Sequence, residues 1–219
     1  MDHVGLALLP GIAALRAVGR ISFVLYCFLL TEGFIHTCSR RAYLMRLLVF
    51  AGLSEMPFDL FLFGRVFQPL EQNVFFSLAL ALGALWMMEQ GVRHQPMLTA
   101  AALLGLCLAA MALRVSYAWL GIVLCMCFYT YRAHPLRRAV SVVATEALYA
   151  ATLYAGGESL SWALMQLFSI AAFLPIGFYN GKSGTRRFRA AFYAAYPVSL
   201  LLLYAIRTAR ILPPYWGIF

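Results

Sequence analysis

The most informative stretch of this chain begins at Val115, ends at Tyr131 and reads VSYAWLGIVLCMCFYTY. It is almost continuously apolar, whereas a membrane β-strand alternates between lipid-facing and interior residues. Within a bilayer, only helices and closed barrels pair all of their backbone polar groups internally. The stretch therefore predicts an α-helix that belongs to a membrane bundle.

The composition of the whole chain agrees with a membrane protein. Of its 219 residues, 63% are hydrophobic and 11% are charged, whereas roughly a quarter of the residues of a soluble domain are charged. No linker interrupts the chain, so residues 1–219 are expected to form a single membrane domain. We predict an all-α, polytopic transmembrane helical bundle with about eight full spans. These spans coincide with the apolar runs 21–34, 43–63, 74–88, 97–113, 115–131, 140–154, 160–178 and 190–206.

The N-terminal apolar run, residues 5–18, is too short for a span and is interrupted by Pro10 and Gly11. It predicts a short interfacial or re-entrant helix. With eight spans after it, Met1 starts on the outer side of the membrane without a helix to deliver it there. We therefore expect a further membrane helix upstream of Met1.

The net charge of +9 comes from bases at the ends of the apolar runs. Cytoplasmic loops are enriched in Lys and Arg, so orientation in the membrane explains these bases and no nucleic-acid partner is expected. The face with more bases is predicted to be cytoplasmic, which places the C-terminus outside an inner (cytoplasmic) membrane. The cysteines form no CxxC pair, so free thiols and no metal site are expected.

Several polar residues interrupt the spans, where a charge costs about 3 kcal/mol. Glu32, His36 and Arg40 recur every four residues, which predicts one polar helix face with either a ligand-binding role or a structural ion pair. Glu55 and Asp59 flank Pro57, which predicts a kink. These two carboxylates could serve acid-base chemistry, bind a cation, or pair with Arg46 or Arg65.

Three further motifs stand near the predicted span ends. Gln72 and Asn73 open a span, where Asn is a typical helix cap. The turn at residues 179–184 contains Asn180 and Lys182 and precedes Arg186, so it could offer N–H groups and bases to phosphate or could simply carry solvated bases. Tyr196 precedes Pro197 inside the last span and supplies a hydroxyl group beside a kink.

Taken together, these motifs resemble the TraX family of bacterial membrane proteins, whose namesake N-acetylates the pilin subunit of a conjugative pilus. The matching pieces are Asp2-His3-Val4-Gly5, Gly19-Arg20-Ile21-Ser22-Phe23, Glu32-Gly33-Phe34-Ile35-His36-Thr37, Glu55-Met56-Pro57-Phe58-Asp59, Gln72-Asn73-Val74-Phe75-Phe76, Tyr179-Asn180-Gly181-Lys182 and Tyr196-Pro197. The resemblance covers nearly the whole chain, and it also extends remotely to polytopic acyltransferases that use acyl-CoA.

The resemblance implies an acetyltransferase that uses acetyl-CoA as the donor substrate, with a pilin-like peptide or a glycan as the acetyl acceptor. His3 matches the base of the remote relatives, with Asp2 as its partner and Arg20 or Asn73 as oxyanion donors. The CoA phosphates are expected near Arg40, Arg41, Lys182 and Arg186. The remaining candidate substrate-binding residues are Glu32, His36, Glu55, Asp59, Gln72, Asn180 and Tyr196.

Two other function classes remain open from the sequence. A transporter or channel would use Glu32, Glu55 and Asp59 to bind an ion or a substrate. A non-catalytic factor in a membrane assembly would need none of these side chains for chemistry. Stabilisation by acetyl-CoA would separate both of these classes from an acetyltransferase.

Overall fold

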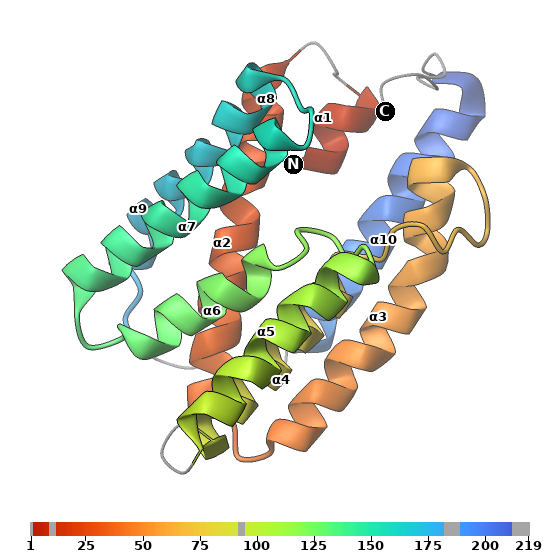
Figure 1. Ribbon diagram of the computed structural model, residues 1–219. Coiled ribbons are helices and arrows are strands. Elements are labelled where there is room, and N and C mark those ends of the chain that lie inside the picture. The colour runs from red at the N-terminus through yellow and green to blue at the C-terminus, as the bar shows by residue number, and fades with distance from the viewer. Residues whose placement is uncertain (1, 9–11, 92–94, 182–188, 212–219) are drawn as a thin grey trace.

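A computed structural model describes residues 2–8, 12–91, 95–181 and 189–211 (Figure 1). The helices in this part of the chain confirm the expected all-α bundle. They are α1 (Asp2–Leu8), α2 (Ala13–His36), α3 (Arg40–Phe63), α4 (Val74–Gly91), α5 (Pro96–Ala112), α6 (Leu120–Thr130), α7 (Pro135–Ala155), α8 (Leu160–Met165), η1 (Gln166–Ala172), α9 (Phe173–Gly177), α10 (Arg189–Ile206) and the single turn η3 (Arg207–Ile211).

Four of the described helical stretches are long and apolar enough to cross a membrane. They are Ala13–His36, Val74–Gly91, Leu160–Gly177 and Ala190–Ala209. The third of these consists of α8, η1 and α9 joined without a break, and its middle, η1, is wound as a tighter 3₁₀ helix. The total of eight spans stays a prediction.

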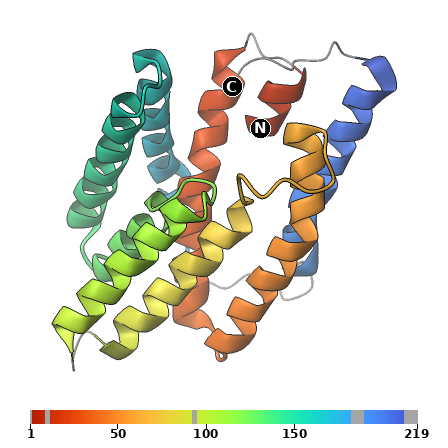
Figure 2. The same ribbon diagram turned by 45° about the vertical axis from the view of Figure 1, so that its right-hand side comes forward.

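Helix α2 runs through the middle of the bundle (Figures 1 and 2). It packs against α1, α4, α6 and η1, while α7 covers α6 and η1 on one side and α3 pairs with α4 and α10 on the other. We call the end of the bundle at which α2 ends and α3 begins the lower end, and the opposite end the upper end. Helix α1 and the C-terminal end of α10 both lie at the upper end (Figure 1).

The core of the bundle is apolar and closely packed around α2. Phe34, Leu82, Leu85 and Leu124 are fully buried. Many large apolar side chains point outward, and a bilayer suits such a surface better than water does. Examples are Met45, Val49, Leu53, Leu104, Leu108, Phe168, Leu174, Phe192 and Leu202.

Two of the expected helix boundaries were wrong. Residues 5–18 do not form one short helix, because α1 ends at Leu8 and the long helix α2 already begins at Ala13. The run 115–131 is not helical throughout, because its first residues form a turn and α6 begins only at Leu120. The turn before α6 pairs with Gln72 of a distant loop.

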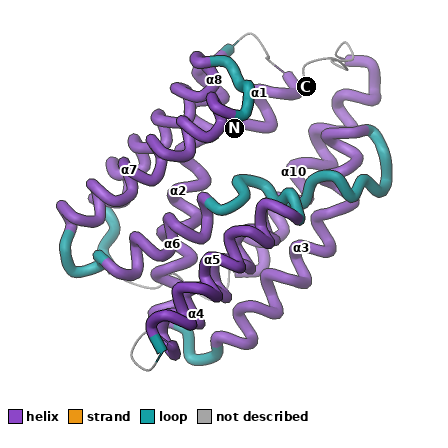
Figure 3. The backbone as a smooth tube through the Cα atoms, in the orientation of Figure 1, coloured by secondary structure: helices purple, strands orange, loops and turns teal. Residues whose placement is uncertain are grey.

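Two loops lie partway down the bundle rather than at its upper end (Figure 3). The α3–α4 loop descends from the upper end to the start of α4, and the α5–α6 loop joins two helices that both stop at this level. The loops meet through a parallel bridge between Gln72 and Val115. Their meeting point places irregular, hydrogen-bonding backbone at mid-height in an otherwise apolar bundle.

Candidate functional site

At the lower end, a carboxylate and an imidazole lie side by side on α2. Glu32 Oε2 lies 3.7 Å from His36 Nε2, one helical turn away. Arg40 does not continue this polar stripe, because α2 ends at His36 and Arg40 is the first residue of α3. The prediction of one helix face with all three residues was therefore wrong. Arg40 instead pairs with Glu89 of α4 and lies over the Phe34 ring.

The segment after α9 reaches the same lower end. Partial burial raises the pKa of the Tyr179 hydroxyl, and the neighbouring Glu32 carboxylate raises this pKa further. Asn180 and Arg41 are exposed. Lys182 and Arg186 lie outside the described residues. The structure thus brings Glu32, His36 and the end of α9 together, and it places Arg41 at the same end.

Asn73 organises the start of α4 at mid-height. Its Oδ1 accepts a hydrogen bond from the Phe75 N–H at 3.0 Å, which confirms the predicted helix cap. Its Nδ2 group donates to Ala51 O at 2.8 Å and to the Glu55 carboxylate. Because these partners occupy the Asn73 amide, it holds Glu55 against the N-terminus of α4 instead of facing open space.

Asp59 is fully buried one turn beyond Glu55. Its Oδ2 accepts a hydrogen bond from the Gln68 N–H at 2.7 Å, while no partner is recorded for Oδ1. Within the described part of the chain, neither Glu55 nor Asp59 forms an ion pair with Arg46 or Arg65. Both carboxylates instead tie α3 to the descending loop.

His3 lies at the upper end against two aromatic rings. Its imidazole meets the Phe61 ring edge-on, with centroids 5.4 Å apart, and the Tyr196 ring at 5.9 Å. The helix α1 that carries His3 is held by Ala7, which is buried with Phe61 in a small apolar cluster. The backbone of Asp2 begins α1, but its side chain is not among those described.

Tyr196 connects His3 to the centre of the bundle. The Tyr196 hydroxyl lies near the Val74 N–H at the start of α4, and it is close enough to Glu55 and Tyr117 to interact with them electrostatically. Its ring also meets Phe75 edge-on at 5.4 Å. The structure therefore brings together His3, Tyr196, Glu55 and Asn73, which come from four helices or their caps.

Arg20 of α2 occupies the other side of this central region. Its guanidinium lies 4.6 Å over the Trp162 ring, and its Nη1 donates a hydrogen bond to the Tyr117 hydroxyl at 3.3 Å. Such a stack fixes the plane of an arginine in an apolar environment. Tyr117 stands in the loop between α5 and α6, so Arg20 links the long helix α2 to that loop.

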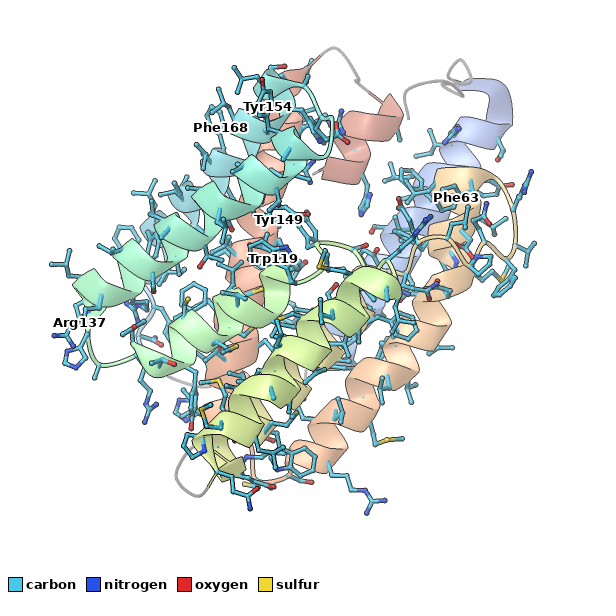
Figure 4. The ribbon with its side chains drawn as sticks, in the orientation of Figure 1. Phe63, Trp119, Arg137, Tyr149, Tyr154 and Phe168 are labelled. Atoms are coloured by element: carbon cyan, nitrogen blue, oxygen red, sulfur yellow. The ribbon has the colours of Figure 1, made fainter. Side chains whose placement is uncertain are left out.

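A buried carboxylate that the sequence reasoning missed faces Arg20. Glu146 of α7 is fully buried, and its Oε2 accepts a hydrogen bond from Gln166 Nε2 at 3.0 Å. The charge of Arg20 acts on Glu146, and the Ser169 hydroxyl lies nearby. An acid in the middle of the apolar run 140–154 is a functional signal by itself. Figure 4 shows Tyr149 of the same helix beside Trp119 of the α5–α6 loop.

The candidate site residues thus form two groups along α2. His3, Arg20, Glu55, Asn73, Gln72 and Tyr196 lie in the upper half, whereas Glu32, His36, Arg40, Arg41 and Asn180 lie at the lower end. Glu32 is about 18 Å from Arg20 along the helix axis, at a rise of ~1.5 Å per residue. Among the described residues, no group of three or more His, Cys, Asp or Glu side chains could hold a metal ion.

Comparison with known proteins supports the resemblance noted from the motifs. A family described as "TraX protein" matches residues 1–207. The chain belongs to the TraX family. This TraX-family chain is also 32% identical, over 232 aligned positions, to the "Probable fimbrial assembly protein FimC, serogroup H1" of Dichelobacter nodosus, and the alignment covers 93% of the chain and 88% of that relative. No solved structure matches it.

The family and the apolar helices establish the broad class of this protein. It is a helical membrane protein of the TraX family.

Proposed function

We propose that this TraX-family protein transfers an acetyl group from acetyl-CoA, bound at the lower end, to an amine or hydroxyl acceptor in the upper half. The observation that carries the proposal is the division of its polar residues into two groups along α2. The lower group has bases suited to phosphate, and the upper group has a histidine, an arginine and tyrosine hydroxyls suited to acyl transfer.

The lower end is assigned to the cytoplasm, where acetyl-CoA is made. The described bases Arg40, Arg41, Arg132, Arg137 and Arg138 belong to the lower ends of α3, α6 and α7, as the positive-inside rule requires of a cytoplasmic face. Figure 4 shows Arg137 at this end, pointing away from the bundle. Arginine binds phosphate through two parallel hydrogen bonds, so these side chains suit the nucleotide part of CoA.

The pantetheine arm of CoA is linear and would cover the distance of about 18 Å between Glu32 and Arg20 along α2. Glu32, His36 and Asn180 then line its entry. This arm brings the thioester carbonyl to the level of Arg20, beside the meeting point of the two loops.

In the upper half, His3 acts as the general base toward the acceptor. An acceptor amine attacks the thioester carbonyl carbon, His3 takes the proton that the nitrogen loses, and Arg20 stabilises the negative charge that develops on the carbonyl oxygen. The C–S bond then breaks and CoA leaves as the thiol after protonation. Tyr196 and Glu55 line the part of this region that would bind the acceptor, next to the start of α4.

The decisive experiment uses the purified protein in detergent, radiolabelled acetyl-CoA and a short peptide with a free N-terminal amine, with an amino sugar as the second acceptor. His3→Ala should lower acetyl transfer by about 10²- to 10⁴-fold, which is the usual contribution of a general base. His134→Ala is the matched control, because His134 is exposed just before α7. Transfer by His3→Ala at the wild-type rate would remove His3 from the mechanism.

Binding of the donor can be tested without any acceptor. Saturating acetyl-CoA should raise the melting temperature of the wild-type protein, because a ligand that binds only the folded state stabilises it. Arg41→Ala, together with Arg40→Ala, should reduce this shift. No shift in the wild-type protein would exclude the proposed donor and would favour transport or assembly.

A further inference from the structure

The corner between α6 and α7, at the lower end of the bundle, carries three arginines. Arg132 lies just after α6, while Arg137 and Arg138 belong to the first turn of α7. We call these three residues the corner arginines. Both ribbon views show this corner at the side of the bundle, apart from the start of α3 (Figures 1 and 2). The corner arginines are thus separate from Arg40 and Arg41, which begin α3.

The corner arginines have no acidic partner in the part of the chain that the structure describes. Arg40, by contrast, is paired with Glu89. The first turn of α7 contains no acidic residue, and the Nε atom of Arg138 is buried without a hydrogen-bond partner. Positive side chains at the start of a helix are repelled by the positive end of the helix dipole. An anion supplied from outside the chain would relieve this repulsion.

The start of α7 and an aromatic neighbour prepare the corner for a phosphate group. Helix α7 begins at Pro135 and has no side-chain cap, and N–H groups at a helix start have no acceptor within the helix. The guanidinium of Arg132 is held in place, because its Cζ lies 4.9 Å from the centroid of the Tyr129 ring and its Nη1 donates to Tyr129 O at 3.0 Å. Guanidinium groups and helix N-termini both bind phosphate.

Apolar side chains beside the corner arginines indicate a lipid as the source of the phosphate. Leu136 and Val140 are 76% and 60% exposed, and they lie one turn apart on the same face of α7. Arg137 points away from the bundle (Figure 4). Acyl chains can cover such an apolar face while the headgroup meets the bases, whereas a soluble nucleotide would leave it exposed. Tyr129 and Tyr131 at the end of α6 fit this level, because tyrosine is enriched where a membrane meets water.

We propose that the corner arginines bind the phosphate of an anionic phospholipid. The headgroup supplies the negative charge that the corner lacks, and the acyl chains pack on Leu136 and Val140. A zwitterionic lipid fits less well, because its ammonium group cancels the charge of its phosphate. This lipid site is separate from the two groups of residues along α2 and does not depend on acetyl transfer. It leaves Arg40 and Arg41 to the CoA phosphates.

The test is a titration of the full-length protein in detergent micelles with fluorescent phosphatidylglycerol and, in parallel, with fluorescent phosphatidylcholine. The wild-type protein should bind phosphatidylglycerol more tightly. Each base near an anionic lipid contributes about fivefold to the affinity, so the triple variant Arg132→Gln, Arg137→Gln and Arg138→Gln should bind phosphatidylglycerol about 10²-fold more weakly. Its affinity for phosphatidylcholine should change by less than about threefold, because that lipid has no net charge.

Single variants supply the matched control. Arg137→Gln should weaken the binding of phosphatidylglycerol by about fivefold. Arg65→Gln should leave it unchanged, because Arg65 is exposed in the α3–α4 loop at the other end of the bundle. Arg137→Lys keeps the positive charge and should keep most of the affinity. The melting temperature of each variant in micelles of phosphatidylcholine and detergent checks that the fold is retained.

Three results would overturn the lipid site. They are equal affinity of the wild-type protein for the two lipids, unchanged phosphatidylglycerol affinity in the triple variant, and an equal loss in Arg137→Gln and Arg65→Gln. Displacement of phosphatidylglycerol by acetyl-CoA would assign the corner arginines to the nucleotide and would also overturn it. A wild-type protein that binds phosphatidylglycerol through the corner arginines but binds no acetyl-CoA would overturn the proposed function alone.

Discussion

The lower end of the bundle and its mid-height region use polar residues in opposite ways. At the lower end, Arg40 and Glu89 form an ion pair between regular helices, and each side chain keeps about a third of its surface exposed. At mid-height, Asp59 and Glu146 are fully buried and each has one carboxylate oxygen without a recorded partner. An exposed ion pair changes the free energy of unfolding little, whereas a buried and incompletely paired carboxylate destabilises the folded state.

The backbone is regular at the lower end and contains unfavourable conformations at mid-height. Helix α3 starts at the lower end with a regular cap, in which the Ser39 hydroxyl accepts a hydrogen bond from the Ala42 N–H. The mid-height loop instead contains left-handed residues, including Tyr117. A protein keeps buried, incompletely paired acids and strained backbone together mainly where they serve chemistry. Under the proposed function, this contrast assigns the reacting atoms to the mid-height region and donor binding to the lower end.

The largest expected effect on stability is at Asn73. Asn73→Ala removes a helix cap and the two hydrogen bonds that the Asn73 amide donates to Ala51 O and to the Glu55 carboxylate. We expect a loss of about 4 kcal/mol in the free energy of unfolding, measured by titration with SDS in mixed micelles. Gln72→Ala is the matched control, because that amide makes a single 3.3 Å bond to Pro69 O. Equal losses in the two variants would show that the start of α4 does not depend on Asn73.

The next effect compares a buried acid with an exposed one. Glu146→Ala leaves the buried Gln166 amide without its acceptor and should cost about 3 kcal/mol in the free energy of unfolding. Glu146→Gln keeps a hydrogen-bond acceptor for Gln166 and should cost less than half as much. Glu89→Ala removes only a partly exposed pair and should cost about 1 kcal/mol or less, and this loss should shrink further in high salt. A larger loss for Glu89→Ala than for Glu146→Ala would reverse the contrast between the two regions.

The smallest effect tests how closely the helices approach at the lower end. A Cβ at Gly33 of α2 would lie 2.9 Å from the Tyr43 hydroxyl oxygen of α3, whereas nothing lies within 4 Å of a Cβ at Gly52. Gly33→Ala should therefore destabilise the bundle by about 1 kcal/mol. Gly52→Ala should stabilise it by about 0.5 kcal/mol, because alanine loses less backbone freedom in a helix. Thermal unfolding of the two variants in parallel measures this difference, and a shift of the same sign in both would contradict it.

Local sequence signals placed most of the helices and the helix cap at Asn73 correctly. The apolar runs predicted the helices around residues 43–63, 74–88, 97–113 and 160–178, because burial in lipid or core requires an apolar surface whatever the neighbours are. The cap at Asn73 was also predictable, since capping depends on residues within one turn. Glu146 could have been found by the same rule that selected Glu55, as a carboxylate inside an apolar run.

The break between α2 and α3 and the turn before α6 were not predictable from neighbouring residues in the sequence. The break between His36 and Arg40 separates residues that a helical period would place on one face. The turn at residues 114–119 interrupts an apolar run because Val115 and Ser116 pair with Gln72, more than forty positions earlier. A local pattern cannot report such a partner, because hydrogen bonds between distant segments depend on the whole arrangement of helices.

By itself, the sequence determined that this protein is a helical membrane bundle and that it resembles the TraX family, since both follow from composition and from short motifs. Only the tertiary structure decided that Arg20, Tyr117 and Trp162 meet from three separate segments, and that His3 lies against Phe61 and Tyr196. The physical reason is that helix formation and lipid burial are local preferences, whereas a site is a set of distances between segments that packing alone brings together.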